Sequence, residues 1–325
     1  DKSLKKKYVY KKKNKTPIYS ELRDIIKKIN EFKPNLIIAF GGGSAIDYAK
    51  IANVVTDVSK IKNVVIDQNL KLRKRCKLLA IPTTAGSGAE VTPSAVIYYK
   101  NKKYSLEGSE ILPDYYFLIP KYLKLLNKKI KASSGFDAIA QSIESIFSLR
   151  SNKKSLYYSR KSLKISLNNF LSFVNKPNNS NMNNMLIAAN LSGKAIAISK
   201  TTAPHALSYP FTSLFNVDHG HAVSLTLNNI LKFNYENKEK SKKSFGLEKR
   251  FQILFDLTNT KTIFGLIDFL NFLKKKTNLH NNLSKFKINI KKDYKKILSG
   301  INLKRLKNNP VILNRTTLKK IILEI

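Results

Sequence analysis

Three of the four histidines in this 325-residue chain lie close together, at His205, His219 and His221. Farther upstream, Asp137 and Gln141 stand four residues apart in a segment with helical periodicity, so both side chains leave the same face of a helix. A carboxylate and an amide oxygen from one helix, joined by imidazoles from others, form a site suited to a divalent transition metal. The alternative is that each histidine is a hydrogen-bonded core or loop residue. The clustering favours the metal site.

A strand, a glycine run and a helix follow one another early in the chain. The apolar run 36–40 is typical of a buried strand, and residues 45–53 of a helix. Glycines let the backbone approach a phosphate, and a helix N-terminus offers free N–H groups and a positive dipole end. Ser44 stands at the expected N-cap, where Asp47 completes a capping arrangement. A plain glycine turn is the alternative to this phosphate cradle, which consists of Gly41, Gly42, Gly43 and Ser44 with Asp47 beside it.

A second loop follows the apolar run 78–81, which we interpret as another buried strand. Its residues, 83–88, are small and partly hydroxylated. In open α/β sheets, ligands bind at the carboxyl ends of the strands. The hydroxyls of Thr83, Thr84 and Ser87 therefore suit a ribose or a nicotinamide carboxamide. The alternative is a turn that is simply rich in small residues.

The elements around these motifs predict two domains. In the first third, a helix at 19–32 precedes the strands, and a hairpin around Asn101 joins strands at 96–99 and 103–105. After Pro120, apolar residues recur at helical spacings up to a last helix within 310–325, and 176–184 is predicted to be a polar loop. We therefore expect an α/β, Rossmann-like dinucleotide-binding domain over 1–120 and an all-α domain for metal and substrate over 121–325.

Composition excludes several classes of protein. Hydrophobic residues make up 42% of the chain, enough for real cores, and the single cysteine, Cys76, excludes a disulfide framework or thiolate cluster. No apolar run approaches the ~18 residues of a membrane span, and no apolar segment of a signal peptide follows the lysine-rich start. A cytoplasmic protein without a membrane partner is expected.

The net charge of +39 raises the question of nucleic-acid binding. The lysine runs 5–7 and 11–13 lie beside Tyr8 and Tyr10, but no nucleic-acid recognition motif accompanies them. Lysine, asparagine and isoleucine are all abundant, as in chains encoded by A/T-rich codons. We therefore expect no nucleic-acid partner, and leave open a local role for positive charge near an anionic substrate.

Taken in order, these motifs resemble those of the iron-containing (group III) alcohol dehydrogenases. The matching stretches are 40–50, 82–92 and 135–144, and the resemblance runs from about residue 15 to the end. It implies a dinucleotide-binding α/β domain, a helical domain, and a divalent metal in the cleft between them. The opening strand of that family has no counterpart in the sequence. The sequence is therefore either a fragment or a chain whose sheet lacks its first strand, and the choice between NAD and NADP is not predicted.

The resemblance also implies the roles of individual residues. The family's ligands are an Asp, a His four residues later, and two His fourteen residues apart. Gln141 stands in place of the first of these histidines. It is either a weak oxygen ligand, which should lower metal affinity or change metal preference, or a residue that does not bind the metal. Fe2+ is the expected metal, with Zn2+ and Mn2+ as alternatives. Lys103 joins the two threonines and Ser87 at the nicotinamide half of NAD(P)H. The implied metal ligands are Asp137, Gln141, His205 and His219.

One subgroup, the phosphonoacetaldehyde reductases, is especially similar. The similarity lies in 201–210, 218–222 and 103–108, together with Gln141. It implies reduction of phosphonoacetaldehyde to 2-hydroxyethylphosphonate by a homo-oligomer, expected to be a dimer. Tyr209 takes the place of a family histidine near the nicotinamide, and Tyr209 or His221 would relay a proton. The alternatives are a general short-chain alcohol dehydrogenase, an inactive paralogue and a basic nucleic-acid-binding protein.

Overall fold

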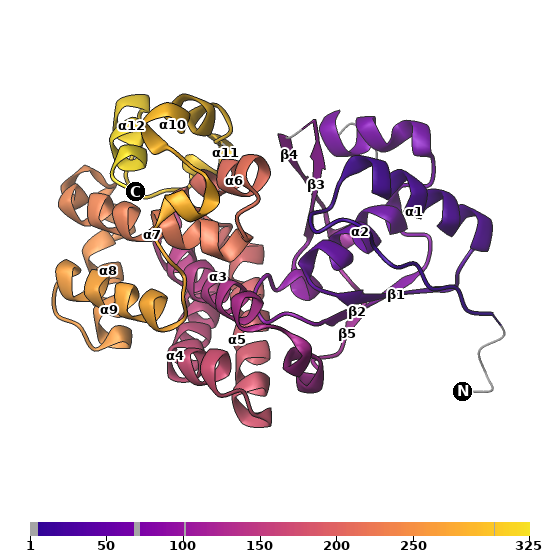
Figure 1. Cartoon of the computed structure of the whole chain (residues 1–325), viewed down its shortest axis with the longest axis horizontal. Helices are drawn as coiled ribbons and strands as arrows, with labels where there is room; N and C mark the ends of the chain where they lie inside the picture. Colours follow the sequence, from indigo (N-terminus) through magenta and orange to yellow (C-terminus); the bar gives the residue numbers. More distant parts are fainter. Residues whose placement is uncertain (1–5, 68–71, 101, 302) are drawn as a thin grey trace. The chain divides into compact units, whose positions relative to one another are not determined.

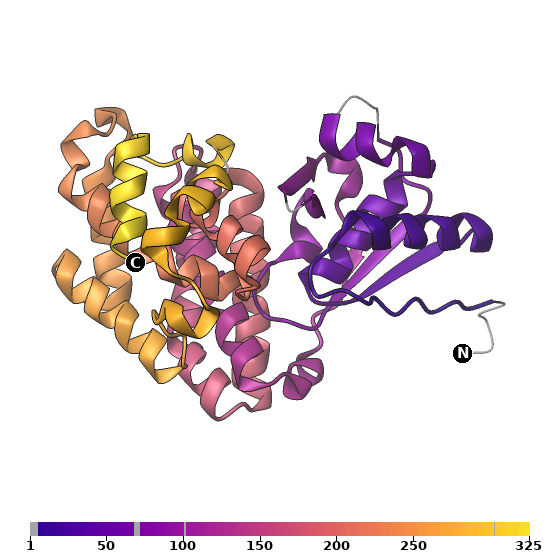
Figure 2. The ribbon, with the colours of Figure 1, turned by 45° about the horizontal axis from the view of Figure 1, so that its top comes forward.

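The computed structural model describes residues 6–67, 72–100, 102–301 and 303–325. Lys5, in the first lysine run, and Asn101, at the centre of the predicted hairpin, lie outside these ranges. The chain divides into two compact units, which are described separately below (Figures 1 and 2). The first contains Asp1–Pro82 and Ala89–Phe117, and the second contains Thr83–Gly88 and Leu118–Ile325.

The first unit is built on a parallel sheet with the strand order β1-β2-β5. Strands β1 and β2 pair in register from Leu36 opposite Lys77 to Gly41 opposite Pro82, so their carboxyl ends lie side by side. A separate antiparallel pair, β3 and β4, confirms the predicted hairpin strands. The elements are α1 (Tyr19–Phe32), β1 (Leu36–Gly41), α2 (Gly43–Val54), β2 (Lys77–Pro82), β3 (Ser94–Tyr99), β4 (Lys102–Glu107) and β5 (Tyr115–Tyr116).

Helix α1 has the bounds that the sequence predicts, because its apolar residues recur on one face. Leu22, Ile25 and Ile26 are buried in a core shared with α2 and the hairpin. Strand β1 differs from the predicted buried strand, because one of its faces is exposed. Its alternate residues Leu36, Ile38 and Phe40 are 44%, 55% and 51% exposed. Since alternate residues of a strand share a face, these three form one exposed apolar row, called the β1 apolar row below.

The second unit is helical, as predicted. The prediction of a polar loop over 176–184 is wrong. Helix α4 ends at Asn175 and α5 already begins at Asn179, so most of this segment is helical. Asn178 and Asn181 form a reciprocal capping box at this start, so the asparagines begin a helix. The helices are α3 (Lys128–Phe147), α4 (Lys153–Asn175), α5 (Asn179–Ser199), α6 (Ala203–Phe215), α7 (His219–Glu236), α8 (Leu247–Thr258), α9 (Ile263–Lys276), α10 (Ile290–Ser299), α11 (Leu303–Leu306) and α12 (Arg315–Leu323).

Small residues allow α3, α4 and α5 to pack closely. Ser142 on α3 donates to Ser162 Oγ on α4 (2.8 Å), and Ser162 donates to the carbonyl of Ala188 on α5 (2.7 Å). A serine bonded in this way satisfies its own polar group inside the core and leaves room for the facing backbone. This packing holds α3, which carries Asp137 and Gln141. Among the helices of the described ranges, none combines the length and the apolar character that crossing a bilayer requires.

Candidate functional site

Asp137, His205 and His219 come together in the helical unit. Asp137 lies in the middle of α3, His205 near the start of α6 and His219 at the first position of α7. One ligand atom from each lies within 4.8 Å of the other two, and His205 Nε2 is 3.3 Å from Asp137 Oδ1. Asp137 and His205 are buried and His219 is half-buried. One carboxylate oxygen and two imidazole nitrogens suit a first-row divalent metal, so the donor set fits the predicted group.

Glu144 fixes the orientation of the His205 ring. Its Oε2 accepts a hydrogen bond from His205 Nδ1, while Oε1 accepts from Thr202 N (2.9 Å), Thr202 Oγ1 (3.0 Å) and His205 N (3.2 Å). Within the described residues, His205 Nε2 makes no hydrogen bond. The carboxylate therefore holds the proton on Nδ1 and leaves Nε2 as the metal-directed atom. It also caps the start of α6, where free N–H groups need an acceptor.

The charges around His205 are only partly balanced within the protein. Burial of the ring lowers its pKa, but the carboxylates of Glu144 and Asp137 outweigh burial and raise the pKa of His205 to about 9. At neutral pH the ring of the metal-free protein is therefore protonated and offsets one of the two buried negative charges. A bound divalent cation would offset the same charges, which again fits the donor set to a metal.

Gly220 brings the first turn of α7 against α3. A Cβ atom at this position would lie 1.9 Å from the carbonyl oxygen of Ser133 and 2.9 Å from Asp137 Cβ. The backbone N–H of His221 donates to Ser133 Oγ (3.1 Å), which satisfies one free N–H of the helix start. The absence of a side chain at Gly220 therefore sets the short separation between His219 and Asp137.

Gln141, predicted as a ligand, lies beside the cluster with its amide engaged on both sides. Its Nε2 donates to Asp137 Oδ2 (3.2 Å) and its Oε1 accepts from Ser192 Oγ (3.0 Å). In this arrangement the amide nitrogen faces Asp137, so the side chain holds the carboxylate in place. The predicted role of Gln141 as an oxygen ligand stays a prediction.

The two residues predicted to relay a proton lie in different surroundings. Tyr209 lies one turn after His205 on α6, and its ring stacks against His219 with 6.3 Å between centroids and 22° between planes. His221 Nε2 donates to the carbonyl of His280 (2.7 Å), and its ring packs edge-on against Phe286. Burial lowers the pKa of His221. The structure brings Tyr209 to the cluster and turns the ring of His221 toward another part of the unit.

Replacing Glu144 with glutamine should weaken metal binding by about 10- to 100-fold, the usual effect of losing a carboxylate that orients a ligating histidine. Glutamine has nearly the same shape, so α6 keeps an acceptor for its first N–H groups, but the charge that holds the Nδ1 proton is lost. Metal titration followed by isothermal calorimetry measures this. The control is Glu248→Gln, an exposed carboxylate of the same unit. Equal affinities in the wild type and Glu144→Gln would contradict the role of Glu144.

In the first unit, α2 begins at Gly43, two residues earlier than predicted. The N-cap is Gly42, whose carbonyl accepts from Ala45 N (2.9 Å) and Ile46 N (3.3 Å). The predicted cap by Ser44 with Asp47 is therefore wrong, because both residues already lie within the helix and no side chain caps this end. N–H groups of a first turn that lack a side-chain acceptor suit an anion.

The glycine run is closely packed. A Cβ atom at Gly41 would lie 2.7 Å from the Cβ atom of Ala45, so the turn from β1 into α2 requires glycine there. Gly42 and Gly43 continue from the N-cap into the helix. The geometry suits close approach of a phosphate to the backbone, which remains a proposal for Gly41, Gly42, Gly43 and Ser44.

Asp47 and Lys103 lie within electrostatic reach of each other. Burial raises the pKa of Asp47 to about 6, against the opposing effects of Lys50, the Val96 backbone N–H and Lys103. Asp47 on α2 and Lys103 on β4, both predicted to bind the cofactor, therefore belong to one cluster of charged side chains near β3. Their role in cofactor binding stays a prediction.

Lys50 ties α2 to the hairpin. The side chain is fully buried and its Nζ donates to Thr92 O (2.7 Å), Thr92 Oγ1 (3.0 Å) and Ser94 O (2.9 Å). Burial lowers its pKa to about 8, against the opposing effects of Asp47 and Glu90. Lys50 is not among the predicted site residues, although it lies three residues after Asp47 on the same helix face.

The loop Thr83–Gly88 packs within the helical unit. A Cβ atom at Gly86 would lie 2.6 Å from the carbonyl of Ser134 on α3. Gly88 has a positive φ of 58°, and a Cβ there would lie 2.5 Å from Gly193 Cα on α5. These glycines fix the loop against two helices, while Thr83, Thr84 and Ser87 stay half-buried. Binding of the nicotinamide half by their hydroxyls remains a proposal.

Two residues beside the candidate metal site of Asp137, His205 and His219 were missed from the sequence. Glu144 lies seven residues after Asp137 and three after Gln141, so helical spacing alone places the three on one face and could have indicated its role. Gly220 carries no local signal beyond its place between two histidines. Its function depends on the distance to a carbonyl of α3, which only the folded structure shows.

The sequence matches known protein families over almost its full length. Residues 2–120 match the profile described as iron-containing alcohol dehydrogenase. Residues 131–325 match the profile of the C-terminal region of the Fe-containing alcohol dehydrogenase family. The second match includes every residue of the metal cluster.

Individual relatives and solved structures agree with these profiles. The chain is 32% identical to 4-hydroxybutyrate dehydrogenase of Clostridium kluyveri, over 68% of this chain and 60% of that protein. It is 28% identical to phosphonoacetaldehyde reductase of Streptomyces viridochromogenes, over 65% of this chain and 56% of that protein. The matches thus span less than two thirds of these relatives. The fold is similar to that of sulfoacetaldehyde reductase from Bifidobacterium kashiwanohense in complex with NAD+, with a TM-score of 0.84, 24% identity, and coverage of 96% of this chain and 81% of that one.

Proposed function

The chain belongs to the iron-containing alcohol dehydrogenase family, and from that premise we propose that it is a metal-dependent NAD(P)H oxidoreductase that reduces a short aldehyde with an anionic group at its far end. The observation that carries the proposal is the cluster of Asp137, His205 and half-buried His219, with Glu144 bonded to His205. A metal there, expected to be Fe2+, supplies a Lewis acid for the carbonyl oxygen, and NAD(P)H supplies the hydride.

The residues of the chain prepare the two groups for this reaction. Asp137 and the two histidines hold the metal, and Glu144 keeps Nε2 of His205 directed at it. In the other unit, the open N-terminus of α2 and the glycine run would bind the pyrophosphate of the cofactor. The hydroxyls of Thr83, Thr84 and Ser87, with Lys103, would position its nicotinamide half.

We assign the proton relay to Tyr209. Its ring stacks against His219, which brings this side chain beside the candidate metal site. His221 is less suited, because its Nε2 is bonded to a backbone carbonyl and its pKa is lowered by burial. A tyrosine hydroxyl can pass a proton to the alkoxide oxygen directly or through one water.

Two of the similar proteins support an anionic substrate. Their names contain 4-hydroxybutyrate and phosphonoacetaldehyde, each a short chain that ends in a carboxylate or a phosphonate. The segments 201–210 and 218–222, together with Gln141, favour phosphonoacetaldehyde as the first substrate to test.

The test is oxidation of NADH or NADPH with phosphonoacetaldehyde and with propanal, each with and without added Fe(II). We expect kcat/KM for phosphonoacetaldehyde to be at least about tenfold higher, since ~1.4 kcal/mol of binding to the anion corresponds to that factor. Turnover should depend on the metal. Equal rates with both aldehydes would support a general short-chain alcohol dehydrogenase. No turnover with either aldehyde at full metal loading would support an inactive paralogue.

A further inference from the structure

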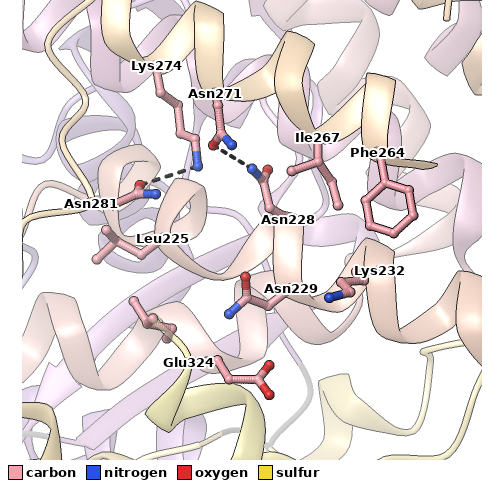
Figure 3. Close-up of a pocket in the computed structure, with 11 residues that line it drawn as sticks. Leu225, Asn228, Asn229, Lys232, Phe264, Ile267, Asn271, Lys274, Asn281 and Glu324 are labelled. Carbon is pink, nitrogen blue, oxygen red and sulfur yellow. Dashed lines mark hydrogen bonds between the residues drawn. The ribbon is translucent and has the colours of Figure 1, made fainter. Parts of the chain in front are cut away.

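A cavity of about 220 Å³ opens at the surface of the helical unit, between α7, α9 and the end of α12 (Figure 3). Its polar lining consists of Asn228, Asn229 and Lys232 from α7, Asn271 and Lys274 from α9, and Asn281 and Glu324. None of the metal-cluster residues lines it. At about 30 Å³ for each water, the cavity has room for roughly seven waters or a small metabolite.

The amino group of Lys274 lacks strong partners. The side chain is only 3% exposed, and its Nζ donates to Ser224 O at 3.4 Å and to Asn281 Oδ1 at 3.3 Å, both longer than an ordinary hydrogen bond. In the described part of the chain no carboxylate pairs with it, and burial alone lowers its pKa to about 8. A buried ammonium without a carboxylate is costly, so an anion from outside the chain would stabilise it.

Asn228 provides a second, independent sign of a ligand. The residue is 7% exposed, and its Nδ2 donates to Asn271 Oδ1 at 2.8 Å. This bond fixes the orientation of the amide on the cavity wall (Figure 3). Over the described residues, Asn228 Oδ1 is a buried acceptor without a hydrogen-bond donor. Buried acceptors are almost always satisfied, so the ligand should carry a donor as well as a negative charge.

We propose that this cavity binds a small hydroxy-carboxylate, with the carboxylate at Lys274 and a hydroxyl donating to Asn228 Oδ1. The amide groups of Asn271 and Asn281 flank the two positions. Lys232 lines the same cavity and adds positive charge. Glu324 also lines it, which disfavours a dianion such as phosphate and favours a single negative charge. The cavity holds polar groups on opposite helices, so an apolar ligand would leave them unsatisfied.

The test uses three probes of one carbon skeleton, titrated by calorimetry into the full chain without added metal. Glycerate carries both the carboxylate and the hydroxyls, propionate only the carboxylate, and glycerol only the hydroxyls. Glycerate should bind saturably, propionate at least tenfold more weakly, and glycerol not measurably over the same range. Absence of saturable glycerate binding, or equal binding of all three, overturns the proposal.

Two variants separate the charge from the acceptor. Lys274→Met should weaken glycerate binding at least tenfold. Thermal unfolding should show that this variant is folded, since methionine fills the same volume without a buried charge. Asn228→Leu should reduce the affinity for glycerate to that for propionate and leave the affinity for propionate unchanged. The matched control is Lys275→Met, an exposed neighbour. Unchanged glycerate binding in folded Lys274→Met overturns the proposal.

Binding at the metal cluster must be distinguished from binding at this cavity. In Asp137→Asn, which disables the metal cluster, glycerate should bind as in the wild type. Loss of binding there would place glycerate at the metal cluster and overturn the proposal. The result is independent of aldehyde turnover, so failure of either proposal can be recognised separately.

Discussion

Replacing His219 with alanine is expected to remove bound metal and aldehyde reduction together, while the helical core stays folded. The cluster offers one carboxylate and two imidazoles from the described residues, so loss of one imidazole removes a third of its donors. We expect the affinity for Fe2+ or Zn2+ to fall by on the order of 100-fold or more, about 2.7 kcal/mol. His219 is half-buried at the first position of α7, so its removal leaves the core intact. Metal content after gel filtration measures the loss of metal, and circular dichroism shows whether the helical core stays folded.

The matched control is His280→Ala. The His280 side chain is exposed, and only its carbonyl takes part in the contact with His221, so this variant should keep its metal and its activity. Asp137→Asn should behave like His219→Ala, because a neutral amide is a much weaker ligand than a carboxylate. Wild-type metal content in both ligand variants would show that the cluster is not the metal site.

Replacing Gly220 with alanine should also abolish metal retention, although it removes no ligand. The new Cβ would lie 1.9 Å from a backbone carbonyl of α3, which cannot turn aside as a side chain would. The first turn of α7 must then move away from α3, carrying His219 away from Asp137. Overpacking of this kind costs about 1–3 kcal/mol of stability. Metal titration and chemical unfolding together test the expectation.

Gly265→Ala is the matched control, since it also adds one methyl group to a helix of the same unit. Its Cβ would lie 3.4 Å from the nearest atom, Thr262 Oγ1, which is an ordinary contact. Alanine is favoured over glycine in a helix by about 1 kcal/mol, so this variant should be more stable and keep its metal. Full metal retention by Gly220→Ala would show that the α3–α7 contact does not set the ligand distance.

The grouping of Asp137, His205 and His219 was largely predictable because its signal is local chemistry. Histidines are rare in this chain, and the helical spacing of Asp137 and Gln141 places both on one face. The proximity of α3, α6 and α7 was not predictable from spacing. It depends on packing that the single positions Gly220 and Glu144 make possible, one by lacking a side chain and the other by bonding two helices. The family resemblance supplied what the spacing could not.

Element types were predicted better than element starts. Helix α1 follows from its apolar periodicity, and the hairpin strands from their composition. The start of α2 was misplaced because serine is a common N-cap, whereas here the carbonyl of Gly42 already accepts the first helical bonds. The start of α5 was missed because asparagines suggest a loop, although two of them form its capping box. Both errors arise where one residue type serves loops and helix ends alike.

The solution behaviour of the protein should depend on ionic strength because of the β1 apolar row. Leu36, Ile38 and Phe40 present adjacent apolar side chains to water, which favours contact between molecules. The net charge of +39 opposes such contact by mutual repulsion. Salt shortens the range of that repulsion, from about 10 Å at 0.1 M to about 3 Å at 1 M. Concentrated stocks are therefore best kept in dilute buffer, since high salt would favour self-association through this strand.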